Sequence, residues 1–367
     1  MGLSAAPPFV LLSISFAPPP EPAVDAPFSR IAVIGAGAIG GVTACRLAAA
    51  HPDLQIACKN PEIVQLARGP GLHVFSPAGH SRVRLNAVAQ IEDLAGPLEV
   101  VFLATKAMDT ADASRRLLPL LTPEAAVVSL QNGICEEELA TVLGPERVVG
   151  CVVGWGASHH GPGDLEITSP GEFVVGEWGR PAGERLRVIQ RMLQAVVPTR
   201  ITENILGELY AKLIINACIN SLGVLTGQPL GRLLASRRAR NLFTGVMREA
   251  MAVAQALGIK VAPGGGGRLD YYRFLANRGA WGEFCRHLTI CLVGLKYRRI
   301  RSSSLQSIER GRPSEIPFLN GYICRRGLQA GVPTPLNQAI VDLVAQIEEG
   351  LCPIAPANLR APALAVY

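Results

Sequence analysis

The chain has 367 residues, of which 49% are hydrophobic and 17% are charged. This length exceeds what one ordinary core needs and predicts two globular domains, and the composition excludes a largely disordered protein. The net charge of +6 suits an anionic ligand but falls short of a nucleic-acid-binding signature. We therefore expect a globular protein with a small-molecule ligand and no nucleic-acid partner.

Nine cysteines lie between Cys45 and Cys352 without any Cys-x-x-Cys pair, which indicates reduced thiols in the cytoplasm and no disulfide framework or zinc ribbon. The adjacent pair His159-His160 has no third ligand at metal spacing, so no metal is predicted. No apolar run reaches the roughly 18 residues that a membrane span needs. The composition thus predicts a cytoplasmic protein that does not cross a membrane.

Residues 1–29 precede the predicted fold. The apolar stretch Phe9 to Ala17 has no Lys or Arg before it, unlike a secretory signal, and Pro18-Pro19-Pro20 begins a Pro-rich segment. We expect a disordered leader over residues 1–29, a first domain over 30–200, a second over 203–350 and a tail over 351–367.

Strand-like and helical segments alternate through the first half. The apolar runs with strand character are Arg30 to Gly35, Leu54 to Cys58, Val100 to Thr105, Ala126 to Leu130, Val148 to Val153 and Phe173 to Gly176. Alternation of this kind predicts an α/β fold, here a Rossmann domain with a mostly parallel sheet.

A glycine-rich turn follows the first strand and opens an alanine-rich helix: Gly35-Ala36-Gly37-Ala38-Ile39-Gly40. Glycines at 35, 37 and 40 allow a tight turn and a close approach of the backbone to a pyrophosphate at the helix N-terminus. A merely structural turn is the alternative, but the strand before it and the helix after it favour a dinucleotide site.

Lys59 ends the second strand, and no Asp or Glu occurs before Glu62. A carboxylate at this position binds the ribose of NAD, whereas a basic residue accommodates the extra phosphate of NADP. NADP is therefore the predicted cofactor, with an ordinary exposed loop lysine as the alternative.

Two polar residues follow later strands and should reach the ligand-binding edge of the sheet. Lys106 comes directly after Val100 to Thr105, and Asn132 lies in Gln131-Asn132-Gly133 after the next strand. Lys106 could equally be a solvated residue at a helix start, and Asn132 a turn residue.

The second half has helical periodicity at Glu208 to Leu222, Ala239 to Leu257 and Pro335 to Glu348, and no convincing strand. Within the first of these, Lys212, Asn216 and Asn220 are spaced by four. They form one polar row on a single helix face, surrounded by Leu, Ile and Ala. Desolvation lowers the pKa of such a lysine toward the range of a proton donor, so we predict a site here rather than a narrow solvated stripe.

The segment Ser303 to Gly321 carries further polar candidates. Ser314 is a plausible helix cap, which would place Glu315 in the first helical turn, where an acidic residue is favourable without any catalytic role. The sequence by itself therefore leaves open whether Glu315 belongs to the site or only stabilises the start of a helix.

Five motifs in this order resemble the ketopantoate (2-dehydropantoate) reductase family over about residues 30–348: the glycine turn, Thr105-Lys106-Ala107, Gln131-Asn132-Gly133, the Lys212/Asn216/Asn220 row and the segment Ser303 to Gly321. The resemblance implies NADPH-dependent reduction of ketopantoate to pantoate in pantothenate biosynthesis. It also implies an all-helical second domain like that of 6-phosphogluconate dehydrogenase, and it allows a homodimer.

The resemblance implies a role for each residue as well. Lys212 would be the general acid, and Glu315 would hydrogen-bond and position the substrate. Asn216 and Asn220 would hold its hydroxyl and ketone side, Ser304 would hold its carboxylate, and Lys106 and Asn132 would line the nicotinamide end.

Two other classes of protein remain open at this point. A β-hydroxyacid or sugar-acid dehydrogenase also pairs a Rossmann domain with a helical domain carrying Lys and Asn four apart, but it is not expected to contain the Ser304/Glu315 segment. A non-catalytic NADP-binding regulator would not need a desolvated lysine. A reductase of a different 2-keto acid is a third alternative, within the same reaction type.

Overall fold

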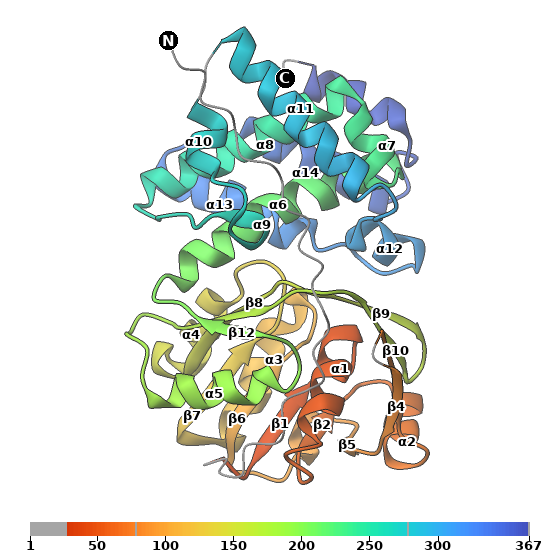
Figure 1. Ribbon diagram of the computed structural model, residues 1–367, viewed down its shortest axis with the longest axis vertical. Coiled ribbons are helices and arrows are strands. Elements are labelled where there is room, and N and C mark those ends of the chain that lie inside the picture. The colour runs from red at the N-terminus through yellow and green to blue at the C-terminus, as the bar shows by residue number, and fades with distance from the viewer. Residues whose placement is uncertain (1–27, 78, 277–278, 366–367) are drawn as a thin grey trace, which may run out of the picture.

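The computed structural model describes residues 28–77, 79–276 and 279–365, and the leader predicted for residues 1–29 lies almost wholly outside them. Figure 1 shows an α/β part, red to green, beneath a helical part, green to blue. This confirms the predicted fold class, because the N-terminal part is built on a mostly parallel sheet and helices make up the C-terminal part.

An eight-stranded sheet forms the centre of the α/β part, in the order β12-β11-β8-β7-β6-β1-β2-β5. Six of its strands run parallel, while β11 and β12 run in the opposite direction. Its strands are β1 (Ile31–Ile34), β2 (Gln55–Ala57), β5 (Asn86–Val88), β6 (Leu98–Leu103), β7 (Leu121–Ser129), β8 (Val148–Val153), β11 (Phe173–Glu177) and β12 (Thr199–Ile201).

The order of the strands reverses between β1 and β6, which are neighbours although helices and strands separate them in the chain. Ligands of open parallel sheets bind at such a switch point, outside the carboxyl ends of the strands. The helices of this part are α1 (Ala38–Leu47), α2 (Pro61–Arg68), α3 (Thr110–Leu117), α4 (Glu136–Leu143) and α5 (Glu184–Gln194).

A second, four-stranded sheet was not anticipated from the sequence. Its order is β4-β3-β10-β9, formed by β3 (Leu72–Ser76), β4 (Gly79–Val83), β9 (Gly156–Gly161) and β10 (Asp164–Ser169). These strands are short and partly exposed, so they lack the continuous apolar runs that mark buried strands. The turn over residues 161–163 joins β9 to β10, which pair antiparallel within this second sheet.

Helices form the C-terminal part, and no strand occurs among its described residues, as predicted. They are α6 (Ile205–Thr226), α7 (Leu230–Ala235), α8 (Arg237–Ala256), α9 (Gly264–Gly267), α10 (Tyr271–Ala276), α11 (Ala280–Lys296), α12 (Ser303–Glu309), α13 (Asn320–Ala330) and α14 (Pro335–Glu348). The glycine segment at α9 is a single turn, in which Gly265 and Gly266 have left-handed φ angles of 61° and 70°.

Helix α6 is the core helix of the upper part and also reaches the sheet. Asn204 caps its start by accepting a hydrogen bond from the Gly207 amide, and Gly227 ends it in the left-handed conformation. A side chain at Gly150 or Gly176 would collide with Ile205, so these glycines let α6 approach β8 and β11. Within the described residues α6 alone has the length and apolar character of a membrane span, but most of it is buried inside the protein.

Candidate active site

The glycine-rich turn lies at the switch point of the sheet. Gly35 has a φ of 102°, and a Cβ there would lie 2.7 Å from the carbonyl oxygen of Ala104 at the end of β6. A Cβ at Gly40 would lie 2.0 Å from the Gly35 oxygen, whereas a Cβ at Gly37 would meet no atom within 4 Å. Two of the glycines thus serve packing, and the third leaves open space at the N-terminus of α1, where a pyrophosphate fits.

Lys59 follows β2 at the same edge of the sheet, with an exposed side chain. Its Nζ lies 3.2 Å from Oδ1 of Asp109, in the short helical turn η2 (Ala107–Asp109) after β6. This ion pair was not foreseen, because the two residues are 50 positions apart. The turn between β2 and α2 holds no carboxylate before Glu62.

Hydrogen bonds from the Gln131 side chain connect the loops that follow β6 and β7. Its amide nitrogen donates to Oγ1 of Thr105 at 3.1 Å and to Oγ1 of Thr110 at 2.9 Å. Gln131 is buried, and these bonds fix the backbone on either side of it. Lys106 and Asn132, the neighbours of Thr105 and Gln131, are therefore held next to each other at the edge of the sheet.

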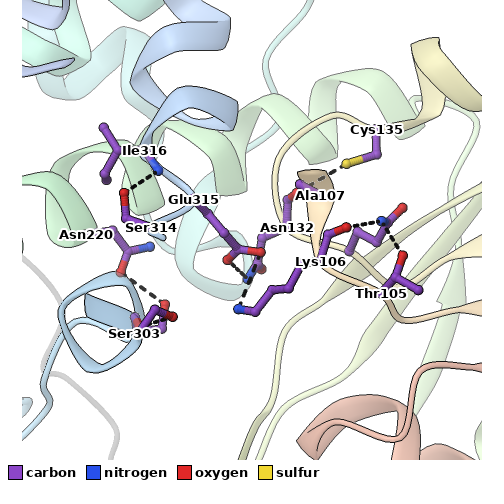
Figure 2. A network of polar contacts seen from close by, with 12 residues as sticks. Thr105, Lys106, Ala107, Asn132, Cys135, Asn220, Ser303, Ser314, Glu315 and Ile316 are labelled. Carbon is purple, nitrogen blue, oxygen red and sulfur yellow. Dashed lines mark hydrogen bonds and ion pairs between the residues drawn. The ribbon is translucent and has the colours of Figure 1, made fainter. Parts of the chain in front are cut away.

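Glu315 joins the two parts of the molecule at this point. Its carboxylate is 3.6 Å from Nζ of Lys106 and accepts a hydrogen bond of 3.2 Å from the Asn132 side chain, as Figure 2 shows. Glu315 is 4% exposed, so the Lys106 charge and the Asn132 donor compensate a buried carboxylate. The sequence left the role of this glutamate undecided, and its contacts link it to the sheet edge.

Two backbone features bring Glu315 to this place. Gly133 has a φ of 87°, and a Cβ on it would lie 2.9 Å from the carbonyl oxygen of Phe318, so only glycine permits this approach. The Ser314 hydroxyl accepts from the Ile316 amide at 3.3 Å, but the turn that follows, η5 (Ile316–Phe318), is a short 3₁₀ helix. Glu315 precedes that turn and does not lie in a first α-helical turn.

Lys212 lies on α6, between the helical core and β8. Burial lowers its pKa, while Cys151, Glu315 and Glu136 act in the opposite direction. No hydrogen bond or ion pair from another described residue holds its ammonium. A desolvated ammonium with a lowered pKa gives up its proton more readily than an ordinary lysine does.

Glu136 is a buried carboxyl group that the sequence did not single out. It begins α4, is 1% exposed, and neither of its oxygens has a well-oriented hydrogen-bond partner among the described residues. Burial raises its pKa to about 7, against the lowering effects of its own backbone amide, of the Ser129 hydroxyl and, to a smaller extent, of the Lys212 charge. Three consecutive glutamates, Glu136 to Glu138, look like a solvated helix start, so only tertiary packing distinguishes the first.

The polar row on α6 continues through Asn216, which is partly exposed, to Asn220, which is buried. The Asn220 side-chain oxygen accepts hydrogen bonds from the hydroxyls of Ser302 at 3.1 Å and Ser303 at 3.2 Å, and Figure 2 shows the contact with Ser303. With its oxygen occupied in this way, the NH₂ group of Asn220 remains as a donor for a ligand.

Ser304 does not reach this contact. Its side chain is 1% exposed, and its hydroxyl is buried without a hydrogen-bond partner among the described residues. At the start of α12, consecutive residues point about 100° apart, so Ser303 meets Asn220 while Ser304 turns into the core. The contact with Asn220 thus belongs to Ser303, and the role that the resemblance implies for Ser304 stays a prediction.

A glycine turn at the switch point, together with a helical region that supplies a partly buried lysine, is typical of the nicotinamide-dependent oxidoreductases with a helical second domain. The chain matches the description "Ketopantoate reductase PanE/ApbA" over residues 31–180 and "Ketopantoate reductase PanE/ApbA C terminal" over residues 204–348. The chain belongs to this family, and it is therefore an NAD- or NADP-dependent oxidoreductase.

Curated relatives and solved structures agree with this assignment. A 2-dehydropantoate 2-reductase of Mesorhizobium japonicum is 29% identical over 87% of this chain and 97% of its own length. The ketopantoate reductase structure from Ralstonia eutropha JMP134 is 30% identical, covers 88% of this chain and 99% of its own, and has a TM-score of 0.74. D-mandelate dehydrogenase, at 22% identity with the same coverage of both chains and a TM-score of 0.73, shares the fold.

Proposed function

We propose that this protein reduces 2-dehydropantoate to pantoate with NADPH, on the route to pantothenate. The observation that carries the proposal is Lys212, a desolvated lysine on the same helix face as Asn216 and Asn220. Reduction of a ketone builds negative charge on its oxygen, and a positioned ammonium both stabilises that charge and delivers the proton. The 2-dehydropantoate 2-reductase names of curated relatives support the choice of substrate.

Each residue of the site has its own role in this proposed reaction. Lys212 donates the proton to the ketone oxygen, and Asn216 and Asn220 donate to the oxygens of the substrate. Glu315 accepts from the substrate hydroxyl and is itself held in place by Lys106 and Asn132. The reduced nicotinamide supplies the hydride when it is bound.

Ser304 holds the substrate carboxylate in this proposal, since its hydroxyl has no hydrogen-bond partner among the described residues and keeps its proton to donate. A hydrogen bond to a carboxylate contributes about 1.5–3 kcal/mol, so Ser304→Ala should raise KM by roughly tenfold to a hundredfold with a smaller effect on kcat. Ser303→Ala is the matched control and should change KM less, because the single hydroxyl proton of Ser303 is already donated to Asn220. Steady-state kinetics of both variants decide between the serines, and a KM effect confined to Ser303→Ala would assign the carboxylate to that serine instead.

The proposed dinucleotide site consists of Gly35, Ala36, Gly37, Ala38, Ile39 and Gly40, with Lys59 reading the extra phosphate and Lys106 and Asn132 at the nicotinamide end. The open space at Gly37 and the absence of a carboxylate in the β2–α2 turn support NADP.

Lys59→Asp should reduce the preference for NADPH over NADH by at least about tenfold, equivalent to ~1.4 kcal/mol, because it replaces an attractive charge with a repulsive one. Asp109→Asn is the companion variant, since it frees Lys59 from its ion pair and should strengthen the preference. The ratio of kcat/KM for the two cofactors measures both effects. A wild-type enzyme that uses NADH more efficiently would contradict the assignment of NADP.

Turnover of NADPH with 2-dehydropantoate and a panel of other 2-keto acids tests the proposed function directly. The highest kcat/KM should belong to 2-dehydropantoate. A higher value for another 2-keto acid would assign the chain to a sister reductase, and reaction only with a 3-hydroxy acid would assign it to the β-hydroxyacid dehydrogenases. Cofactor binding without turnover of any of these would indicate a regulator.

We also propose that the cofactor domain spans residues 30–200 and that the helical substrate domain spans residues 203–350. The enzyme works in the cytoplasm as a homodimer. Its reduced cysteines suit that compartment, since all nine are free thiols.

A further inference from the structure

Three consecutive glutamates open α4, and each lies in a different environment. Glu138 is exposed, Glu137 is partly exposed, and Glu136 is 1% exposed. The Glu136 carboxyl group forms no ion pair and no well-oriented hydrogen bond among the described residues. Burial of a carboxylate without such partners is unfavourable for folding, so a group of this kind indicates a functional role.

Contacts of Glu137 hold the start of α4 against the helical part. Its Oε1 accepts a hydrogen bond of 2.9 Å from the Tyr322 hydroxyl and lies 3.8 Å from Nη2 of Arg326, both on α13. The Tyr322 ring packs edge-on against the ring of Tyr210 on α6, with the centroids 6.0 Å apart. Lys212 lies two residues further along α6. The first turn of α4 is therefore held at the segment of α6 that carries Lys212.

Helices α4 and α6 also pack on the same strand, β8. Burial raises the pKa of the Cys151 thiol on this strand, and the charges of Lys212 and Glu136 both act on that thiol as well. Burial likewise raises the pKa of Cys135, the neighbour of Glu136. Both thiols therefore stay uncharged near neutral pH. Helix α3 packs on α4 too, but its buried residues carry no charge.

Two carboxylates remain that act on Lys212, and they differ in what else compensates them. Glu315 is 3.6 Å from Nζ of Lys106 and accepts a hydrogen bond from Asn132. Glu136 has its own backbone amide and the Ser129 hydroxyl nearby, and Lys212 supplies the positive charge that favours its ionised form. Glu136 therefore acts on Lys212 without a competing ion pair.

We propose that Glu136 is a positioning residue that acts through Lys212: its buried carboxylate keeps the ammonium group protonated and in place for proton transfer to the ketone oxygen. This inference rests on the proposed role of Lys212 as the general acid. Burial lowers the pKa of Lys212, whereas the Glu136 carboxylate raises it. Glu136 has a pKa of about 7, so it is ionised above neutral pH, where the lysine would otherwise lose its proton.

Glu136→Gln tests this role, because it keeps the shape of the side chain and removes its charge. The basic limb of the kcat profile should move to lower pH, and kcat at a fixed pH on that limb should fall about tenfold for each unit of the movement. Glu138→Gln is the matched control on the same helical turn, and its profile should equal that of the wild type. Glu136→Asp keeps the charge, so its limb should lie at a higher pH than that of Glu136→Gln. An unmoved limb in Glu136→Gln overturns the inference.

The difference in melting temperature between Glu136→Gln and the wild type is read without any substrate. Because burial raises the pKa of Glu136 from 4.5 to about 7, the folded wild type loses stability through this group as the pH rises across that range. The variant does not, so the difference in its favour should grow from pH 4.5 to 7. A constant difference overturns the inference. Glu136→Met, which also removes the charge, replaces Glu136→Gln in both experiments if the glutamine variant does not fold.

Acetylation measures the protonation of Lys212 directly, also without substrate. Acetic anhydride reacts with unprotonated lysine, and Lys212 is partly exposed, so mass spectrometry can follow its labelling across pH with the exposed Lys260 as the standard. The labelling midpoint should lie at a lower pH in Glu136→Gln than in the wild type and in Glu138→Gln. Equal midpoints overturn the inference. A lowered midpoint in a protein that does not reduce 2-dehydropantoate would support the coupling of Glu136 to Lys212 and contradict only the proposed function.

Discussion

Lys212→Ala should lower kcat by roughly two to four orders of magnitude, which is the usual contribution of a positioned general acid. The physical reason is that the alanine leaves no group on this face of α6 to donate a proton to the ketone oxygen. Cofactor affinity should change little, because Lys212 comes from the helical part and not from the glycine turn. Steady-state kinetics and a fluorescence titration with NADPH measure the two quantities.

The pH dependence of kcat, measured for the wild type and for Lys212→Ala, provides a second test of this role. Lys212 donates its proton only while it is protonated, so activity is present below its pKa and is lost as the pH rises through that value. Burial lowers this pKa, so the basic limb of the wild-type kcat profile should lie at a lower pH than an ordinary lysine would give. The limb should be missing from the residual activity of Lys212→Ala.

Lys260→Ala serves as the matched control, because Lys260 is an exposed lysine of the helical part that lies outside the site. Its kcat should equal that of the wild type. Thermal melting of each variant verifies that the comparison concerns folded proteins. A folded Lys212→Ala enzyme with nearly normal kcat would remove Lys212 from the mechanism.

Removal of the hydroxyl from the substrate should cause the second large effect, a loss of catalytic efficiency. 2-Keto-3,3-dimethylbutyrate has the ketone, carboxylate and methyl groups of 2-dehydropantoate but lacks its hydroxyl. A site built to hydrogen-bond a hydroxyl leaves its own polar groups unpaired with such an analogue, which costs several kcal/mol. We expect kcat/KM for the analogue to be lower by about two to four orders of magnitude at saturating NADPH.

Variants of Glu315 and of Asn216 identify which side chain binds the substrate hydroxyl. Glu315→Gln keeps the shape of the side chain but removes the charge that Lys106 and Asn132 compensate, so discrimination between the two substrates should shrink. Asn216→Ala should have a similar effect if this asparagine binds the hydroxyl. Equal efficiency of the wild type on both substrates would show that no residue of the site reads the hydroxyl.

The sequence determined those features that depend on local pattern. Apolar runs separated by helices predicted the parallel sheet, and the glycine spacing from Gly35 to Gly40 predicted a turn that the structure places at the switch point. The four-residue spacing from Lys212 to Asn220 sufficed to place three polar groups on one face of a helix, because helical geometry fixes that relation before any packing occurs.

Only the tertiary structure decided the contacts between distant segments. Glu315 lies beside Asn132 although 183 positions separate them, and Ser303 rather than Ser304 faces Asn220, because the direction in which α12 begins is fixed by its packing on α6. Glu136 looks solvated in the sequence and is buried in the fold. Burial and long-range pairing depend on how elements pack, which local periodicity does not encode.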